Sequence, residues 1–412
     1  MKIIKYLKSP IELTVNVPAS KSISNRLLIL QRTSGIPICI SNLSHSEDTY
    51  LLKDLLEKIE THNSSEPLLL QTDNCGTAYR FLCTYLANKE GTWILDGSPR
   101  MRQRPIGALV NTLIKASAEI NYLEKTGFPP LEIKGKKLNA ISWEIDSQQS
   151  SQYVSAVAML LPMIKQNAEI HFPTNIASLQ YVDMTIGIMQ TIGIDIVRND
   201  NIIKYTYIHN VENPISVAVE YDWSVAAVWF VLAALSPKAT VFIKGLQKSN
   251  LQADNIIATW TSHFGVETEY VQTGVKITKK QHQQPQRLIL DCANNLDLVP
   301  YMAVLCAGLK MNAELQNIAN LSLKESNRIE VLQTELGKIA KVDYKDNNLI
   351  INPKEETFPE TVCFSSHDDH RIAMSLAALS CRIHSIYIDN ETCVGKSYPD
   401  FWENFDSFSK EL

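Results

Sequence analysis

The chain has 412 residues, of which 45% are hydrophobic and 20% charged, the composition of an ordinary globular protein of two or three domains. Its formal net charge of -5 argues against nucleic acid as a partner. Its longest uncharged apolar run, 225–236, is shorter than the roughly 20 residues that span a bilayer, so we expect no membrane partner and predict a buried helix there.

Cysteine usage and the N-terminus indicate the compartment. The eight cysteines are widely scattered and none forms a Cys-x-x-Cys pair, which argues against a disulfide scaffold or a structural zinc site. The first residues include lysines but no apolar segment long enough for a secretory signal. We therefore expect reduced thiols and a cytoplasmic location.

Short strand-like runs alternate with helical patterns along the whole chain, which predicts the α/β class. Strands are predicted at 13–17, 93–95, 131–133, 168–172, 241–243, 288–290, 349–351 and 385–388. Amphipathic helices are predicted at 106–114, 183–192 and 329–339, and surface loops at 62–67, 134–139 and 280–286. No internal repeat of 20–50 residues and no Gly/Ser-rich or Pro-rich linker marks a domain boundary.

Most of five short polar segments open a predicted helix, and most include Lys or Arg. They are residues 18–26, 73–80, 150–152, 324–328 and 368–371. Helix capping by Ser, Thr, Asn or Asp would explain any one of them. A cation beside a helix N-terminus also makes an anion-binding site, so the set predicts a small substrate with several negative charges.

Other ligand classes lack their motifs. The chain contains no Gly-x-x-x-x-Gly-Lys-Ser/Thr string and no Gly-x-Gly-x-x-Gly string, which argues against a nucleotide P-loop and a dinucleotide fold. His367 and His370 have no obvious further ligand nearby in the sequence, so we predict no metal site.

Seven segments together resemble the EPSP synthases (3-phosphoshikimate 1-carboxyvinyltransferases) of the enolpyruvyltransferase family. In chain order they are 21–26, 74–80, 99–105, 150–152, 324–328, 369–371 and 396–400. The resemblance covers residues 18–402. It implies two similar domains, each of three βαβαββ units in an inside-out α/β barrel, with the active site in the interdomain cleft.

The resemblance also implies the domain limits and a closing motion. The first enolpyruvyltransferase domain would be 19–220, and the second would combine 1–18 with 221–412. Each half would present cations to the cleft, so bound anionic substrates would draw the domains together. We expect a monomer.

The activity implied is transfer of the enolpyruvyl group of phosphoenolpyruvate to the 5-hydroxyl of shikimate 3-phosphate, with release of phosphate. The reaction proceeds by addition and elimination and uses no metal or organic cofactor. Two alternatives remain open, a UDP-N-acetylglucosamine enolpyruvyltransferase and a homologue that binds ligands without turnover. The motifs at 21–26 and 150–152 favour the phosphoshikimate enzyme.

The residue roles follow from the same resemblance. Asp297 would accept the proton of the 5-hydroxyl, Glu325 would serve the methylene carbon, and Lys21 would take part in acid–base catalysis. The positions for shikimate 3-phosphate are Lys21, Ser22, Arg26, Ser150, Ser151, Gln152, Ser178, Tyr181, Asp297, Asn320 and Lys324. Those for phosphoenolpyruvate are Lys21, Asn74, Gly76, Arg104, Gln152, Arg328, Arg371 and Lys396.

Neighbouring charges lead to three further expectations. Surrounding cations should lower the carboxyl pKa of Asp297 and of Glu325, and crowding by cations should make Lys21 easier to deprotonate. At Gly76 the missing side chain should let the ligand approach, and because this glycine is retained we predict inhibition by glyphosate. Asn327, Cys75 and Ala19 depart from the residues common at these positions in the family.

Overall fold

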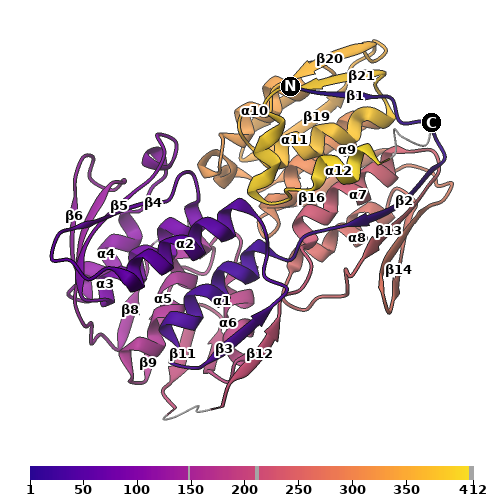
Figure 1. The fold of residues 1–412 in the computed structure, drawn as a ribbon. Coiled ribbons are helices and arrows are strands. Elements are labelled where there is room, and N and C mark those ends of the chain that lie inside the picture. Colours follow the sequence, from indigo (N-terminus) through magenta and orange to yellow (C-terminus); the bar gives the residue numbers. More distant parts are fainter. Residues whose placement is uncertain (147–148, 209–212, 408–412) are drawn as a thin grey trace. The chain divides into compact units, whose positions relative to one another are not determined.

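The computed structural model describes residues 1–146, 149–208 and 213–407 (Figure 1). The chain forms two compact units, which we call the N-unit, Ser20–Val219, and the C-unit, Met1–Ala19 with Glu220–Leu412. The backbone therefore passes from one unit to the other twice, at 19–20 and at 219–220.

The N-unit alternates strands with helices. Its helices are α1 (Lys21–Thr33), α2 (Glu47–Thr61), α3 (Gly76–Asn88), α4 (Gly107–Lys115), α5 (Ser151–Ile164) and α6 (Gln180–Thr191), with the 3-10 turn η1 (Met101–Gln103). Its strands are β3 (Ile38–Ser41), β4 (Leu68–Gln71), β5 (Gly91–Asp96), β6 (Glu119–Tyr122), β7 (Leu131–Gly135), β8 (Ser142–Glu144), β9 (Ala168–His171), β10 (Asp195–Asn199), β11 (Ile202–Thr206) and β12 (Ile215–Ala218).

The C-unit follows the same alternation. Its helices are α7 (Trp223–Leu235), α8 (Ile257–Ser262), α9 (Val299–Gly308), α10 (Arg328–Leu336), α11 (His370–Ala377) and α12 (Phe401–Asp406). Its strands are β1 (Lys2–Lys5), β2 (Ile11–Asn16), β13 (Ala239–Lys244), β14 (Val266–Val271), β15 (Gly274–Lys279), β16 (Arg287–Asp291), β17 (Asn312–Gln316), β18 (Ala340–Lys345), β19 (Asn348–Pro353), β20 (Thr361–Phe364) and β21 (Ser385–Ile388). Its 3-10 turns are η2 (Ala253–Ile256), η3 (Leu296–Leu298), η4 (Ala319–Leu323), η5 (Ala378–Cys381) and η6 (Glu391–Lys396).

One sheet pattern recurs in both units. The sheets β4-β5-β7-β6 and β10-β11-β9-β8 belong to the N-unit, and β14-β15-β13-β2 and β16-β17-β19-β18 to the C-unit. In β16-β17-β19-β18 the pair β16 and β17 is parallel, and β17, β19 and β18 pair antiparallel. The chain order β16-α9-β17-α10-β18-β19 is therefore a βαβαββ unit, as predicted.

The remaining sheet of each unit is smaller among the described residues. It is β12-β3 in the N-unit and β1-β21-β20 in the C-unit. Strand β3 pairs with β12, and β1 pairs with β21, so these sheets are assembled from segments far apart in sequence. The α/β class is confirmed, although these two sheets have fewer strands than a full βαβαββ unit.

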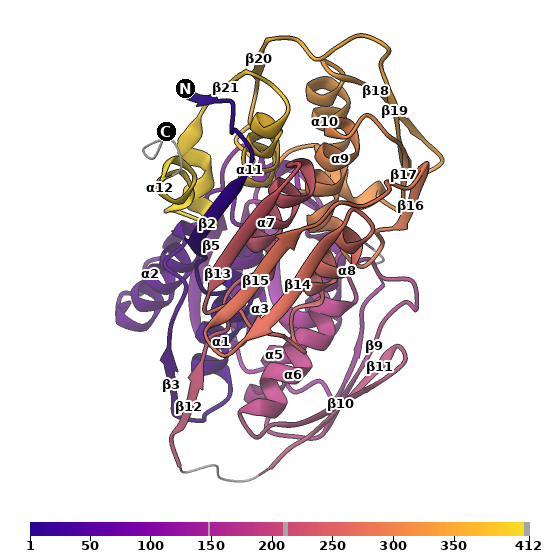
Figure 2. The same ribbon diagram turned by 90° about the vertical axis from the view of Figure 1, so that its right-hand side faces the viewer.

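In the C-unit, three helices are fully buried while a sheet strand has one exposed face. Every residue of α7, α9 and α11 is buried, whereas buried and exposed residues alternate along β16. Helix α9 contacts α7 and α11, α5 contacts α1, α3 and α6, and α7 packs on the sheet that contains β13 and β15 (Figure 2). A helix that is apolar on every side, such as α7, is stable only when other elements of the protein surround it, which is why such helices form the core.

The structure confirms all eight predicted strands, the three amphipathic helices and the buried helix at 225–236, with small shifts at their ends. The predicted loop at 134–139 is partly wrong, because Lys134 and Gly135 complete β7 and pair with Thr92 and Gly91. None of the helices in the described ranges combines the length and the apolar character that crossing a membrane requires.

Candidate functional site

All five polar segments open a helix, although this was predicted only for most of them. The helices α1, α3, α5, α10 and α11 begin at Lys21, Gly76, Ser151, Arg328 and His370. Side-chain caps close three of them: Ser150 Oγ accepts from the Gln152 amide at 3.3 Å, and Asp369 Oδ1 accepts from the Arg371 amide at 3.0 Å. The third is Cys75, whose Sγ accepts from the Ala78 amide at 3.4 Å. Capping therefore accounts for part of the pattern, but not for the cations.

In the N-unit, Arg26 is a buried cation surrounded by neutral groups. It is 2% exposed, and it donates to Thr185 Oγ1 at 2.7 Å and to the carbonyl oxygens of Ser22 at 3.0 Å and Tyr181 at 3.2 Å. Ser155 Oγ accepts a longer bond at 3.4 Å. Among the described residues no carboxylate pairs with this guanidinium. Burial lowers the pKa of Arg26 to about 10, and its positive charge is still available to a bound anion.

Two further buried guanidinium groups, those of Arg80 and Arg104, meet at Gly76. Arg80 donates to Gly76 O at 3.1 Å and to Gln152 Oε1 at 3.0 Å, and Arg104 donates to Asn74 O at 3.2 Å. A Cβ atom on residue 76 would lie 2.3 Å from Arg80 Nη1 and 2.7 Å from Arg104 Nη2. The glycine therefore leaves room for two guanidinium groups, and the approach of a ligand to them stays a prediction.

Lys21 has a partner of opposite sign. Its Nζ lies 2.8 Å from Asp48 Oδ2, and both side chains are largely buried. The expected crowding of Lys21 by other cations stays a prediction. This ion pair holds the Lys21 ammonium group at the start of α1.

The other predicted N-unit residues lie on α5 and at the start of α6. Ser150 caps α5 and Ser151 opens it, while Gln152 Nε2 donates to Thr77 Oγ1 at 3.3 Å. Ser178 has φ of +58°, in the left-handed region that is unusual for serine, and its carbonyl accepts from the Tyr181 amide at 3.1 Å. Helix α5 therefore contacts two of the buried cations: its Ser155 accepts from Arg26, and its Gln152 accepts from Arg80.

In the C-unit, Arg328 is fully buried and joins three carboxylates. Its guanidinium lies 2.9 Å from Asp297 Oδ1, 2.9 Å from Glu325 Oε2 and 2.7 Å from Asp369 Oδ2. Asp369 also accepts from Ser326 Oγ at 3.1 Å. Burial alone would lower the pKa of Arg328, but Asp369, Glu325 and Asp297 outweigh it and hold the pKa above its usual range.

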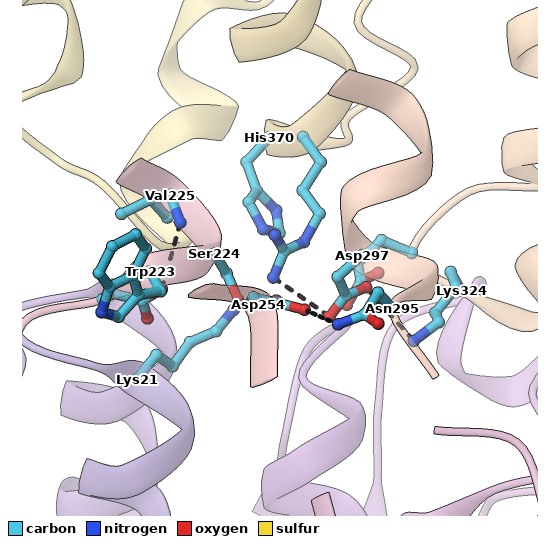
Figure 3. A network of polar contacts seen from close by, with 12 residues as sticks. Lys21, Trp223, Ser224, Val225, Asp254, Asn295, Asp297, Lys324 and His370 are labelled. Atoms are coloured by element: carbon cyan, nitrogen blue, oxygen red, sulfur yellow. Dashed lines mark hydrogen bonds and ion pairs between the residues drawn. The ribbon is translucent and has the colours of Figure 1, made fainter. Parts of the chain in front are cut away.

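Asp297 is a carboxylate of this network that several cations contact (Figure 3). Besides Arg328, it pairs with Lys324 at 3.3 Å and with Arg371 at 3.2 Å, and its side chain is 15% exposed. Burial by itself would raise the pKa of Asp297, but Arg371, Lys324 and Arg328 hold it well below its usual value. The predicted direction for Asp297 is confirmed, and the group is an ionised carboxylate at neutral pH.

Two predicted residues are separate from these ion pairs. Asn320 lies on η4, and Lys396 is the last residue of η6. Both are half-buried and belong to the C-unit, but the ion pairs described above do not include them. Their proposed roles in substrate binding therefore rest on the family resemblance.

Several polar residues of these clusters, among them Asp369, Asp48 and Thr185, were not predicted as site residues. Asp369 was quoted only as part of a motif. An Asp just before a helix start is a signal for a cap, but the cation that Asp369 pairs with, Arg328, is 41 residues away in sequence. Asp48 and Thr185 carry no comparable signal, because 27 and 159 residues separate them from the cations that they bind. Contacts at such separations are set by the packing of helices.

The described part of the chain holds no group of three or more His, Cys, Asp and Glu side chains that could bind a metal ion. What the residues do offer is cations for phosphates and carboxylates, with carboxylates that can exchange protons beside them. Such an arrangement suits transfer chemistry on anionic substrates.

Comparison with known proteins gives a consistent result. The family model for EPSP synthase (3-phosphoshikimate 1-carboxyvinyltransferase) matches residues 6–405. A 3-phosphoshikimate 1-carboxyvinyltransferase of Bacteroides fragilis is 34% identical over 98% of this chain and 97% of its own length. One from Sulfurovum sp. is 32% identical, over 99% of this chain and 98% of its own length.

A solved structure shares the fold at lower identity. The EPSP synthase of Acinetobacter baumannii superposes with a TM-score of 0.74 at 19% identity and covers 98% of this chain and 97% of that one. This likeness concerns the fold alone.

Proposed function

The chain belongs to the EPSP synthase family, and from this premise we propose that it transfers the enolpyruvyl group of phosphoenolpyruvate to the 5-hydroxyl of shikimate 3-phosphate. The observation that carries the proposal is the family match over residues 6–405 together with buried Arg26, whose charge is not balanced by a described carboxylate. Transfer to UDP-N-acetylglucosamine is not favoured, since the curated relatives named above are 3-phosphoshikimate 1-carboxyvinyltransferases.

The reaction has two balanced steps. The 5-hydroxyl oxygen adds to C2 of phosphoenolpyruvate, its proton passes to a base, and C3 gains a proton. The tetrahedral intermediate then loses phosphate from C2 and a proton from C3, which restores the carbon–carbon double bond in the product. Asp297 is the base for the hydroxyl proton and Glu325 serves C3, with Lys21 as their acid–base partner.

The N-unit binds mainly the shikimate 3-phosphate. The proposed ligand groups come from three helices of this unit: α1 supplies Ser22 and Arg26, the start of α5 supplies Ser150 and Ser151, and α6 supplies Tyr181. The charge of Arg26 is the main attraction for the phosphate. The full proposed set is Lys21, Ser22, Arg26, Ser150, Ser151, Gln152, Ser178, Tyr181, Asp297, Asn320 and Lys324.

Phosphoenolpyruvate is bound by cations of both units. Arg104 beside Gly76 supplies positive charge from the N-unit, and Arg328 and Arg371 supply it from the C-unit. The full proposed set is Lys21, Asn74, Gly76, Arg104, Gln152, Arg328, Arg371 and Lys396. The N-unit and the C-unit would then be the two enolpyruvyltransferase domains, supplying residues to one reaction.

Substrate binding also prepares the base. A carboxylate with a strongly lowered pKa accepts protons poorly. Asp297 is in this state because Arg371, Lys324 and Arg328 surround it. Phosphate and carboxylate groups of the substrates that bind these cations offset part of their charge, so the pKa of Asp297 rises towards a useful value when the substrates are present.

The finer assignments concern assembly and location. We propose a cytoplasmic monomer, as the family resemblance implies. All eight cysteines lie in described parts of the chain and are free thiols, as a reducing compartment would keep them. Light scattering after size exclusion would measure the mass in solution, and a value of twice 46.4 kDa would contradict the monomer.

The test is phosphate release from phosphoenolpyruvate by the purified protein, with and without shikimate 3-phosphate, in a buffer that contains a chelator. Release that needs both substrates and is undiminished by the chelator supports the proposal. Calorimetric binding of shikimate 3-phosphate without any release would identify a ligand-binding homologue instead. If neither occurs the substrate is wrong, and UDP-N-acetylglucosamine becomes the next acceptor to try.

A further inference from the structure

A second buried carboxyl group, that of Asp254, lies close to Asp297 in the C-unit (Figure 3). Asp254 belongs to η2 and is 4% exposed. It lies outside every sequence motif described above, and the proposed reaction assigns it no role. Its location beside the proposed base nevertheless makes it a candidate for a contribution to catalysis.

Two hydrogen bonds tie Asp254 to neighbouring elements. Ser224 Oγ, in the first turn of α7, donates to Oδ2. Asn295 Nδ2 donates to Oδ1 at 3.1 Å, and the same amide group donates to the Ala253 carbonyl at 3.2 Å. The Asn295 side chain is therefore held by two consecutive residues of η2.

Asn295 in turn leads into the short turn that carries Asp297. Its main-chain amide donates to Cys292 O at 3.0 Å, and its carbonyl accepts from the Leu298 amide at 2.9 Å. Residues 296–298 form η3, so the bond from Leu298 to Asn295 closes the turn around Asp297. A shift of Asn295 would thus move the backbone of Asp297 relative to Arg328 and Arg371.

The hydrogen-bond partners of Asp254 within the described residues are neutral, namely the Ser224 hydroxyl and the Asn295 amide. Burial raises the pKa of Asp254, the neighbouring charge of Asp297 raises it further, and Arg371 acts in the opposite direction. A buried carboxyl group with these partners is unfavourable as a charge. The carboxyl group of Asp254 instead contributes two oxygen acceptors, which connect α7 to Asn295 through a single side chain.

We infer that Asp254 is a positioning residue for the reaction proposed above, on which this inference rests: through Asn295 it holds the turn that places Asp297. The relevant link is the contact of Oδ1 with the Asn295 amide. An asparagine at position 254 preserves this contact, because its carbonyl oxygen can replace Oδ1 and its amide can donate to the Ser224 hydroxyl. An alanine removes it.

The experiment measures kcat and KM for both substrates by phosphate release. The proteins are the wild type, Asp254→Ala, Asp254→Asn, Asn295→Ala and the double variant with alanine at 254 and 295. A displacement of about 1 Å at a reacting group lowers rates by up to roughly 100-fold, so we expect Asp254→Ala to lower kcat by about 10- to 100-fold. KM should change less than about threefold, because the substrate-binding cations are untouched.

Two results separate positioning from a general loss of structure. The double variant should lose no more than the single variants, because both act through one contact, and Asp254→Asn should recover most of kcat. The matched control is Glu335→Ala, which removes another buried carboxylate of the C-unit, 2% exposed and bonded to His367 and Lys338. It should lower the melting temperature without changing kcat of the folded protein.

Several outcomes would overturn the inference. They are an unchanged kcat in folded Asp254→Ala, additive losses in the double variant, or an Asp254→Asn variant as impaired as the alanine. If Asp254→Ala does not fold, Asn295→Ala tests the same contact with the carboxyl group in place, and normal turnover there would contradict the proposal. An inactive wild type would instead refute the proposed function, which this assay reports separately.

Discussion

Arg26 in the N-unit and Arg328 in the C-unit are both buried guanidinium groups near the start of a helix, but their surroundings differ in charge. Arg26 has hydroxyl and carbonyl acceptors, and burial lowers its pKa to about 10. Arg328 has three carboxylates, which hold its pKa above its usual range. The N-unit therefore presents a cation that attracts an anion, whereas the C-unit has balanced its charge internally and holds carboxylates for proton transfer.

The largest effect should follow removal of a carboxylate from the C-unit. Asp297→Asn keeps the shape of the side chain but removes the base, and loss of general base catalysis typically lowers the rate by roughly 10²- to 10⁴-fold. We expect kcat to fall within this range in the phosphate-release assay. Calorimetric affinity for shikimate 3-phosphate should remain within about threefold of the wild type.

Glu325→Gln should also lower kcat while leaving the affinity for shikimate 3-phosphate nearly unchanged. This variant tests the proposed role of Glu325 at the methylene carbon. Normal turnover in either folded variant would remove that residue from the proposed mechanism. A loss of phosphoshikimate binding as large as the loss of turnover would mean that the C-unit carboxylates shape the binding site instead of exchanging protons.

Arg328→Met should strongly destabilise the protein. It leaves Asp297, Glu325 and Asp369 close together without their shared cation, and breaking a buried pair in this way destabilises by about 3–5 kcal/mol. Urea unfolding at neutral pH would measure the loss. A change below about 1 kcal/mol would show that the three carboxylates do not depend on Arg328.

Arg26→Met is the matched substitution in the N-unit, and it should have the opposite profile. Its partners are neutral, so replacing the buried charge by an apolar side chain of similar size should change the free energy of unfolding by less than about 1 kcal/mol. Affinity for shikimate 3-phosphate should fall by about 100-fold, the usual scale for losing one side of a charged hydrogen-bonded pair. Equal destabilisation by both methionine variants would contradict the comparison.

Gly76→Ala tests the second cation cluster of the N-unit with a smaller change. The new Cβ atom would overlap Arg80 and Arg104 and displace their guanidinium groups, an overpacking worth about 1–3 kcal/mol. We expect KM for phosphoenolpyruvate to rise about tenfold and inhibition by glyphosate to weaken in the same assay. Undiminished wild-type turnover at millimolar glyphosate and subsaturating phosphoenolpyruvate would contradict the predicted sensitivity itself.

The smallest effect is a gradual dependence of stability on acid. Because the folded-state pKa of Asp297 lies well below its unfolded value, the carboxylate stabilises the fold fully above about pH 4, and this contribution disappears as the pH falls through the folded pKa. The raised pKa of Asp254 acts in the opposite sense. Urea unfolding of wild type and Asp297→Asn from pH 6 to pH 3 should show a stability difference that shrinks with acid; a growing difference would contradict the sign.

Much of the architecture could be predicted from local patterns. The alternation of apolar residues located β13 and β19, and the polar segments located the starts of α1 and α11, because these features depend on neighbours within a few residues. Strand β14 was missed because three of its six residues are Glu or Thr and only Val266 is buried. The four-stranded sheets could not be derived from periodicity, since strands such as β2 and β13 pair across more than 200 residues of sequence.

The candidate site also has features that local sequence predicts and features that it does not. The residue types and spacings of the chain alone determined that several helices begin with cations, that Asp297 and Glu325 are available as carboxylates, and that the whole set resembles one enzyme family. Only the tertiary structure decided which groups share a partner: Asp48 with Lys21, Thr185 with Arg26, and Asp254 with Asn295. The physical reason is that charge balance and burial depend on distances of a few ångströms between helices, and no local pattern in the sequence encodes them.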